Sequence, residues 1–233
     1  MNVKRMFAII AIYLLACGGW GILGTTTALR SSQFADLLGK EVQDLWGTPL
    51  VQRAPRVSVK VPGSESVRFL MPSQNELDVG VQLDYRRKGL VWYPTYRVDF
   101  RGAYTITNTE TVAQKVRFHF DFPSKDATYD AFAFRLDDAD LSVPVNTAEG
   151  VGEIVELAPG ESRTFTIAYR TRGLESWRYR IDPHTGRVQN LDLTVKADFR
   201  AIDYPEGSYS PTQPAEVGED GATVVWQATD LDR

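Results

Sequence analysis

The hydrophobic pattern divides the chain into a long apolar run, one amphipathic stretch and a series of alternating segments. The apolar run covers residues 6–29, which are 24 residues without a charge between Arg5 and Arg30. At a rise of 1.5 Å per residue, a helix of this length is about 36 Å long, which is enough to cross a bilayer. The pattern therefore predicts a transmembrane anchor over residues 1–30.

The charges that flank the run predict the orientation of this anchor. Lys4, Arg5 and the N-terminal amine precede the run, and Arg30 is the one basic residue close behind it. Cytoplasmic flanks carry the excess of Lys and Arg. We therefore expect a single-pass protein of the bacterial inner membrane, with a cytoplasmic N-terminus and the bulk of the chain periplasmic or extracellular.

Two other interpretations of the apolar run stay open. Residues 14–18, Leu-Leu-Ala-Cys-Gly, are similar to a bacterial lipobox, in which Cys17 would be acylated. A cleaved signal peptide has an apolar core of about 7–15 residues and then an A-x-A-like site, whereas Trp20, Ile22 and Leu23 prolong this run. The prolonged run favours an uncleaved anchor, in which Cys17 is a thiol inside the membrane helix.

The next segment has a helical period. Apolar residues from Phe34 to Trp46 recur at helical spacing, and Ser31-Ser32 can cap the start of a helix. Residues 47–49, Gly-Thr-Pro, end it. Residues 31–55 are thus predicted to form an amphipathic stalk helix and a linker. The apolar stripe of this helix would pack on the following domain or on the membrane surface.

From residue 56 onward the period changes to two. In residues 116–122, Val and three Phe alternate with Arg, His and Asp, so that one face of the strand is core and the other is solvent-exposed. Residues 151–157 and 165–169 alternate in the same way on either side of Ala-Pro-Gly-Glu, which predicts a hairpin. Further strands are predicted at 56–61, 66–71, 79–85, 96–107, 128–136, 177–181, 191–201 and 223–227.

These segments indicate an all-β domain over residues 56–233. More than ten short strands separated by turn signals are typical of an antiparallel β-sandwich, and the spacing favours an Ig-like one. The predicted organisation is therefore an N-terminal transmembrane helix, a short amphipathic helix and an exocytoplasmic β-sandwich.

The net charge excludes one class of partner. The chain carries 26 basic and 30 acidic residues, and because residues 1–30 hold three basic residues and no acid, the remainder carries −4 − 3 = −7. A mildly acidic body argues against nucleic-acid binding. Residues 203–233 hold seven acids and one arginine, so they account for −6 of this charge.

Two segments, 87–93 and 172–179, share a pattern in which a basic residue, Gly and Leu precede a Trp and a Tyr. Aromatic faces stack on sugar rings or peptides, and arginines pair with carboxylates or phosphates. The alternative is that these rings are strand residues that fill the core. The candidate ligand surface consists of Trp92, Tyr93, Tyr96, Arg97, Trp177 and Tyr179.

No motif points to catalysis, a cofactor or a metal. The sequence has no G-x-S-x-G, no H-E-x-x-H and no phosphate-binding glycine loop. Asp137, Asp138 and Asp140 lack the glycine and the final glutamate of an EF-hand loop, and His119 and His184 have no companion ligands in sequence. We therefore expect a non-enzymatic protein. The enzymatic alternative is a carbohydrate-active domain with an Asp/Glu pair about 5–9 Å apart beside Trp92 and Trp177.

One family resemblance adds to this interpretation. The order of an apolar helix, Arg30, residues 41–47 (Glu-Val-Gln-Asp-Leu-Trp-Gly), Gln52, Pro55 and a strand ending in Val-Lys-Val-Pro at Pro62 resembles the N-terminal pattern of CreD-type inner-membrane proteins, also called cell-envelope integrity proteins. The resemblance implies an N-terminal anchor and a periplasmic β-rich domain, which that family follows with several further membrane helices. It also implies association with the cell envelope. The expected function is binding or scaffolding of envelope components, with the lipid bilayer and envelope proteins or cell-wall glycan as partners.

Overall fold

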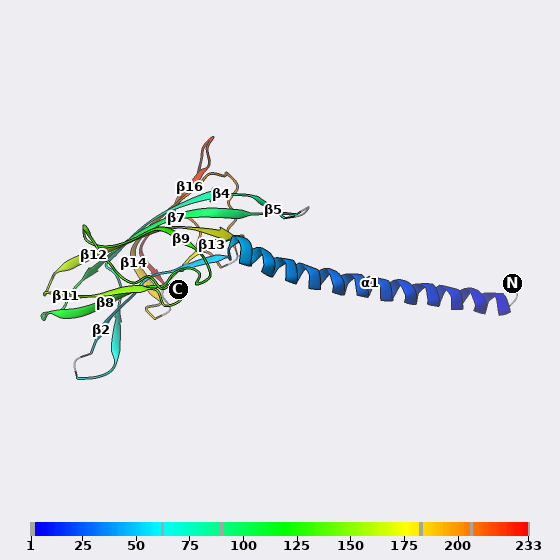
Figure 1. Ribbon diagram of the computed structural model, residues 1–233, viewed down its shortest axis with the longest axis horizontal. Coiled ribbons are helices and arrows are strands. Elements are labelled where there is room, and N and C mark those ends of the chain that lie inside the picture. The colour runs from blue at the N-terminus through cyan, green and yellow to red at the C-terminus, as the bar shows by residue number, and fades with distance from the viewer. Residues whose placement is uncertain (1–2, 62, 89–90, 182–183, 206, 233) are drawn as a thin grey trace. The chain divides into compact units, whose positions relative to one another are not determined.

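The computed structural model describes residues 3–61, 63–88, 91–181, 184–205 and 207–232. It divides into two units, a helical one at Met1–Leu45 and one built from strands at Trp46–Arg233 (Figure 1). The second unit begins ten residues before the predicted boundary at residue 56. It does so because β1 (Leu50–Arg53), which lies in the predicted linker, pairs with β13 (Trp177–Arg180).

A single helix forms the first unit. The helix α1 runs from Val3 to Trp46 without interruption, so the separate helix start predicted at Ser31-Ser32 is wrong. In a continuous helix the N–H groups at these serines bond to preceding carbonyls, and no cap is needed. The helix ends before Gly47, whose φ of 105° suits glycine, as the sequence predicts. The side chains of residues 31–46, which would form the amphipathic stripe, lie outside the described residues.

The larger sheet of the second unit has eight strands. In spatial order these are β10 (Ala139–Asp140), β9 (Tyr129–Leu136), β12 (Ser162–Leu174), β7 (Thr95–Thr107), β4 (Gln74–Leu83), β14 (Arg187–Ala197), β16 (Ala222–Asp232) and β15 (Glu216–Val217). The pairing of β4 with β14 is parallel, and so is that of β1 with β13. The prediction of a purely antiparallel fold is therefore wrong at these two ladders, which join strands far apart in sequence.

The smaller sheet has four strands in the order β11 (Val151–Leu157), β8 (Gln114–Phe120), β2 (Arg56–Lys60) and β3 (Val67–Leu70). All three pairings in it are antiparallel. A separate two-stranded hairpin is formed by β5 (Arg86–Lys88) and β6 (Val91–Tyr93). Each strand predicted from the sequence corresponds to a strand of the structure.

An aromatic core holds the two principal sheets together. Phe118 of β8 stacks on Phe165 of β12 with ring centroids 4.4 Å apart, and Phe120 of β8 lies against Phe100 of β7 with centroids 6.1 Å apart. Each of these rings is at most 2% exposed. Stacked pairs of this kind contribute beyond the area that they bury. The alternating Phe residues of β8 thus contact the larger sheet, as the period-two pattern predicts.

The predicted hairpin between residues 151–157 and 165–169 is wrong. The strand β11 pairs with β8 in the smaller sheet, whereas β12 pairs with β7 and β9 in the larger sheet. The turn at 158–161 therefore carries the chain from one sheet to the other. Asn108 fixes this crossing, because its side-chain amide donates to the carbonyls of Leu157 and Ala158 at 3.0 and 3.1 Å.

Candidate functional site

The residues that directly follow the first Trp/Tyr segment pair with the start of the second. The β7–β12 ladder pairs Tyr96 with Gly173 and Arg97 with Arg172, and the N–H of Glu175 donates to the Pro94 carbonyl at 3.2 Å. Because side chains alternate along a strand, Arg97 points to the opposite side of the sheet from Tyr96. The ladder thus places Tyr96 and Arg97 beside the start of the second segment, and their side chains lie on opposite faces of the larger sheet.

Three of the candidate rings belong to the core. Tyr96 is 5% exposed, and its hydroxyl donates to the Ser176 carbonyl. Trp177 and Tyr179 are half-buried and pack against the core. Burial raises the pKa of the Tyr96 and Tyr179 hydroxyls, so both stay neutral. The interpretation of core side chains therefore holds for these three residues.

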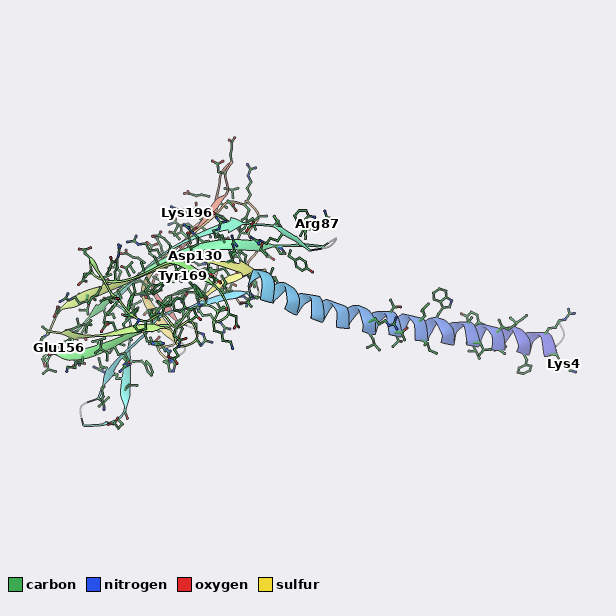
Figure 2. The ribbon with its side chains drawn as sticks, viewed as in Figure 1. Lys4, Arg87, Asp130, Glu156, Tyr169 and Lys196 are labelled. Atoms are coloured by element: carbon green, nitrogen blue, oxygen red, sulfur yellow. The ribbon has the colours of Figure 1, made fainter. Side chains whose placement is uncertain are left out.

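The other aromatic candidates lie on the β5–β6 hairpin, which pairs Arg87 with Trp92 and Arg86 with Tyr93. Trp92 is 61% exposed, and Tyr85, just before β5, is 59% exposed. Asp84, Arg86, Arg87 and Lys88 give this region a formal charge of 3 − 1 = +2. Figure 2 shows Arg87 on this hairpin, away from the interior residue Tyr169.

This basic hairpin is connected through β7 and β12 to Gly47 and Thr48, which are among the first residues of the β unit. The N–H of Leu174 donates to the Thr48 carbonyl at 3.2 Å, and Leu174 is paired with Thr95, two residues after β6. Gly47 packs against the backbone of Arg172, where an added Cβ would lie 3.0 Å from the carbonyl oxygen. The hairpin and the first residues of the β unit therefore share one end of the larger sheet.

A cavity of about 350 Å³ lies elsewhere in the β unit, at a place that the sequence analysis missed. Its walls come from β1, from the start of β2, from the segment that follows β8 and from the loop before β11. The charged residues that line it are Arg53, Arg56, Asp121 and Lys125. They come from segments about 70 residues apart, which the pairing of β2 with β8 and the hydrogen bond from the Gln52 amide to the Asp121 carbonyl bring together.

Asp121 is the acid of this cavity and is held by two partners. His119 Nε2 lies 3.1 Å from Asp121 Oδ1, and Arg56 Nη2 donates to the same oxygen at 2.9 Å. The hydrogen bond with His119 and the charge of Arg56 lower the pKa of Asp121. Gly150 leaves room for the His119 ring, since a Cβ there would lie 3.1 Å from Nε2.

Two of the three acidic residues considered for calcium, Asp137 and Asp140, are paired with arginines. Asp137 accepts a hydrogen bond from Arg163 at 2.8 Å, and Asp140 accepts one from Arg135 at 2.6 Å. Within the described ranges, no group of three or more His, Cys, Asp or Glu side chains is arranged to hold a metal ion.

The helix α1 contains one segment that is long and apolar enough to span a membrane, Lys4–Arg30, with a mean hydropathy of 2.1 and none of its apolar window buried. The segment contains three consecutive threonines whose hydroxyls form hydrogen bonds with the helix backbone. Thr25, Thr26 and Thr27 donate to carbonyls four residues earlier at 2.8–3.0 Å. Their polar hydrogens are thereby satisfied within the helix. Cys17 is exposed on the same segment.

Comparison with known proteins does not assign this chain to a family. No family model matches the chain, and no curated protein matches it. Among solved structures, the chain is similar to a Legionella pneumophila protein provisionally described as a nutrient binding protein. The two are 11% identical, with a TM-score of 0.48 over 79% of this chain and 70% of the other.

Proposed function

We propose that this chain is a membrane-anchored binding protein of the bacterial cell envelope, without enzymatic activity. Its β unit would lie on the exocytoplasmic side of the inner membrane and bind or scaffold envelope components. An Ig-like arrangement of the two sheets and the resemblance of residues 30–62 to CreD-type proteins belong to the same proposal.

The observation that carries the proposal is the exposed apolar segment Lys4–Arg30. Its apolar side chains have no protein surface to cover them among the described residues; Leu15, for example, is 77% exposed. A surface of this kind is unfavourable in water and favourable in lipid. The excess of basic residues before it supports a cytoplasmic N-terminus.

The basic hairpin supports contact of the β unit with the headgroup layer. Residues 31–46 connect the predicted span to the β unit, and the hairpin shares one end of the larger sheet with the first residues of that unit. Exposed Trp and Tyr are favoured at membrane interfaces, and basic residues near an anionic surface gain about 1 kcal/mol each. Anionic headgroups are therefore the proposed partner of this hairpin.

Fractionation tests the anchor. Full-length protein should stay in the membrane pellet after an alkaline wash, and its β unit should be digested by protease added to spheroplasts. An Ile12→Arg, Leu15→Arg variant should lose this retention, because each arginine near a span centre costs about 2.5–3.5 kcal/mol, whereas Ile12→Val should keep it. Recovery of intact wild-type protein in the soluble fraction would overturn the anchor.

Proteoliposomes test the hairpin. A Cys17→Ser, Trp92→Cys variant carrying an environment-sensitive dye should show a blue shift in phosphatidylglycerol vesicles that is larger than in phosphatidylcholine vesicles. The matched control is the same dye at Val112, which is 62% exposed on another loop. Equal emission at the two positions in both vesicle types would count against headgroup contact.

The lipoprotein alternative makes a different prediction about mass. If Cys17 were acylated, the mature protein would begin at Cys17 and incorporate labelled palmitate, and Cys17→Ser would abolish both.

The carbohydrate-active alternative predicts two acids in a cleft between Trp92 and Trp177. These residues now differ in position, one exposed on the hairpin and the other packed on the core, and neither lines the cavity of 350 Å³.

A further inference from the structure

We infer that the cavity lined by Arg53, Arg56 and Lys125 is a binding site for a phosphate monoester. The inference concerns different residues from those proposed to meet the membrane, and it does not depend on the anchor. It follows from the charges of the cavity, from its hydrogen-bond donors and from its size.

The cavity carries an excess of positive charge. Arg53, Arg56 and Lys125 line it with one acid, Asp121, which gives a formal charge of 3 − 1 = +2 with neutral histidines. Asp121 is neutralised by its ion pair with Arg56. Within the described part of the chain, the side chains of Arg53 and Lys125 have no ion-pair partner. Arg180, placed beside Arg53 in the β1–β13 ladder, adds to the positive potential.

Hydrogen-bond donors remain available at the same place. Nη2 of the Arg56 guanidinium is bonded to Asp121 and Nε is buried, which leaves Nη1 as the donor of this side chain. Ser124 Oγ accepts from the Thr48 hydroxyl at 3.0 Å and from the Asp126 N–H at 3.3 Å, so its own hydrogen is free to be donated. Guanidinium groups and hydroxyls are the donors that proteins use for phosphoryl oxygens.

The size and the walls indicate an organic phosphate rather than a bare ion. A cavity of about 350 Å³ is at the lower end of the range found for small-molecule sites. Val51, Phe122 and Pro123 supply apolar wall beside the charged residues. A small polyol or sugar attached to the phosphate would occupy this part.

The charge count selects the monoester. A phosphate monoester carries about −2 at pH 7 because its second pKa is about 6. This charge matches the unpaired Arg53 and Lys125 cations. A phosphodiester or a monocarboxylate carries −1 and leaves one of the two cations unmatched.

The test is a titration of purified full-length protein in a neutral detergent. Glycerol 1-phosphate is the monoester probe, glycerophosphoglycerol the diester, inorganic phosphate the bare ion and glycerol the uncharged analogue. Binding is measured by calorimetry and by protection of Lys125 from an amine-acylating reagent, read by peptide mass spectrometry. Glycerol 1-phosphate should bind most tightly and protect Lys125, and glycerol should do neither.

Substitutions separate a charge effect from damage to the fold. Arg53→Gln and Lys125→Gln alter exposed side chains, and each should weaken glycerol 1-phosphate binding about tenfold or more, equivalent to about 1.4 kcal/mol. Asp121→Asn should strengthen binding, because it removes the one negative charge. The matched control Lys115→Gln, at the far end of β8, should leave affinity unchanged.

Three results would overturn the inference: no saturable binding at millimolar probe, equal binding of glycerol, or equal losses in the Lys125→Gln and Lys115→Gln variants. Vesicles containing phosphatidic acid, which displays a monoester headgroup, distinguish a lipid source from a free metabolite. Competition by these vesicles would identify the lipid as the source, and its absence would identify the soluble monoester, provided that glycerol 1-phosphate binds.

Discussion

The two segments with the Trp/Tyr pattern have similar sequences but differ in how far their Trp side chains are buried. In one, Trp177 and Tyr179 lie on β13, which pairs with β1 and packs on the core. In the other, Trp92 lies on β6, whose strand partner is β5, and remains 61% exposed. The difference shows that a neighbouring strand with a core beneath it decides whether an aromatic strand residue is buried. Composition does not decide it.

The strongest test of this comparison is a pair of alanine substitutions. Trp177→Ala should lower the free energy of unfolding by about 2–3 kcal/mol, less than the cost for a fully buried Trp because this ring is half-buried. Trp92→Ala should change it by no more than about 0.5 kcal/mol. Urea unfolding of both variants measures the two values. Similar losses in the two variants would break the comparison.

A smaller effect should come from the tyrosine hydroxyls of the same two regions. Tyr96→Phe removes the hydroxyl hydrogen bond to the Ser176 carbonyl and should cost about 0.5–1 kcal/mol, a modest value because that carbonyl keeps the Leu50 N–H as a partner at 3.0 Å. Tyr85→Phe alters a side chain that is 59% exposed and should cost nothing measurable. Thermal and urea unfolding of both variants gives the comparison, and an equal cost would show that Tyr96 is not held by this bond.

The charged residues of the two regions should differ in their response to acid. The pKa of Asp121 lies below its ordinary value of 3.8, so its contribution to stability is present above that value and is lost as the pH falls through the lowered pKa. Asp121→Asn should therefore cost about 1 kcal/mol at pH 7, a moderate value because the pair is partly exposed, and progressively less below pH 4.

The control for this pH dependence is Asp84→Asn on the hairpin side, which breaks the pair with Arg86 at 3.1 Å. Both pairs are about one-third exposed, but Asp121 has His119 as a second partner, so we expect the Asp84 pair to contribute less. Unfolding measured at a series of pH values should show a wild-type advantage that fades in acid for Asp121 alone. A flat difference for Asp121→Asn would contradict the lowered pKa.

Local patterns predicted most of the elements. The alternation in residues 116–122 identified β8 and its buried face, and Gly47 correctly marked the end of α1. Pairing between distant segments is harder to predict from the sequence, which indicates a linker where β1 lies and a hairpin over residues 151–169. A turn signal shows that the chain reverses, but both sheets offer partners on the far side of it.

The candidate sites also depend on strand pairing that the local sequence pattern does not predict. Sequence spacing grouped Tyr96 with Trp92, although the first ring faces the core and the second is exposed. The cavity at Arg56 was not predicted, because Arg56, Asp121 and Lys125 belong to separate segments whose proximity depends on the β2–β8 register.

The sequence by itself determined the apolar helix, the strand positions and the distribution of charge, because each of these depends on neighbouring residues and their period. The tertiary structure alone decided the parallel ladders, the crossing between sheets, the burial of Trp177 and the gathering of cations around Asp121. Those features depend on which strands pair across long sequence separations, and many registers satisfy the same alternating pattern. The shared aromatic core selects one of them by packing.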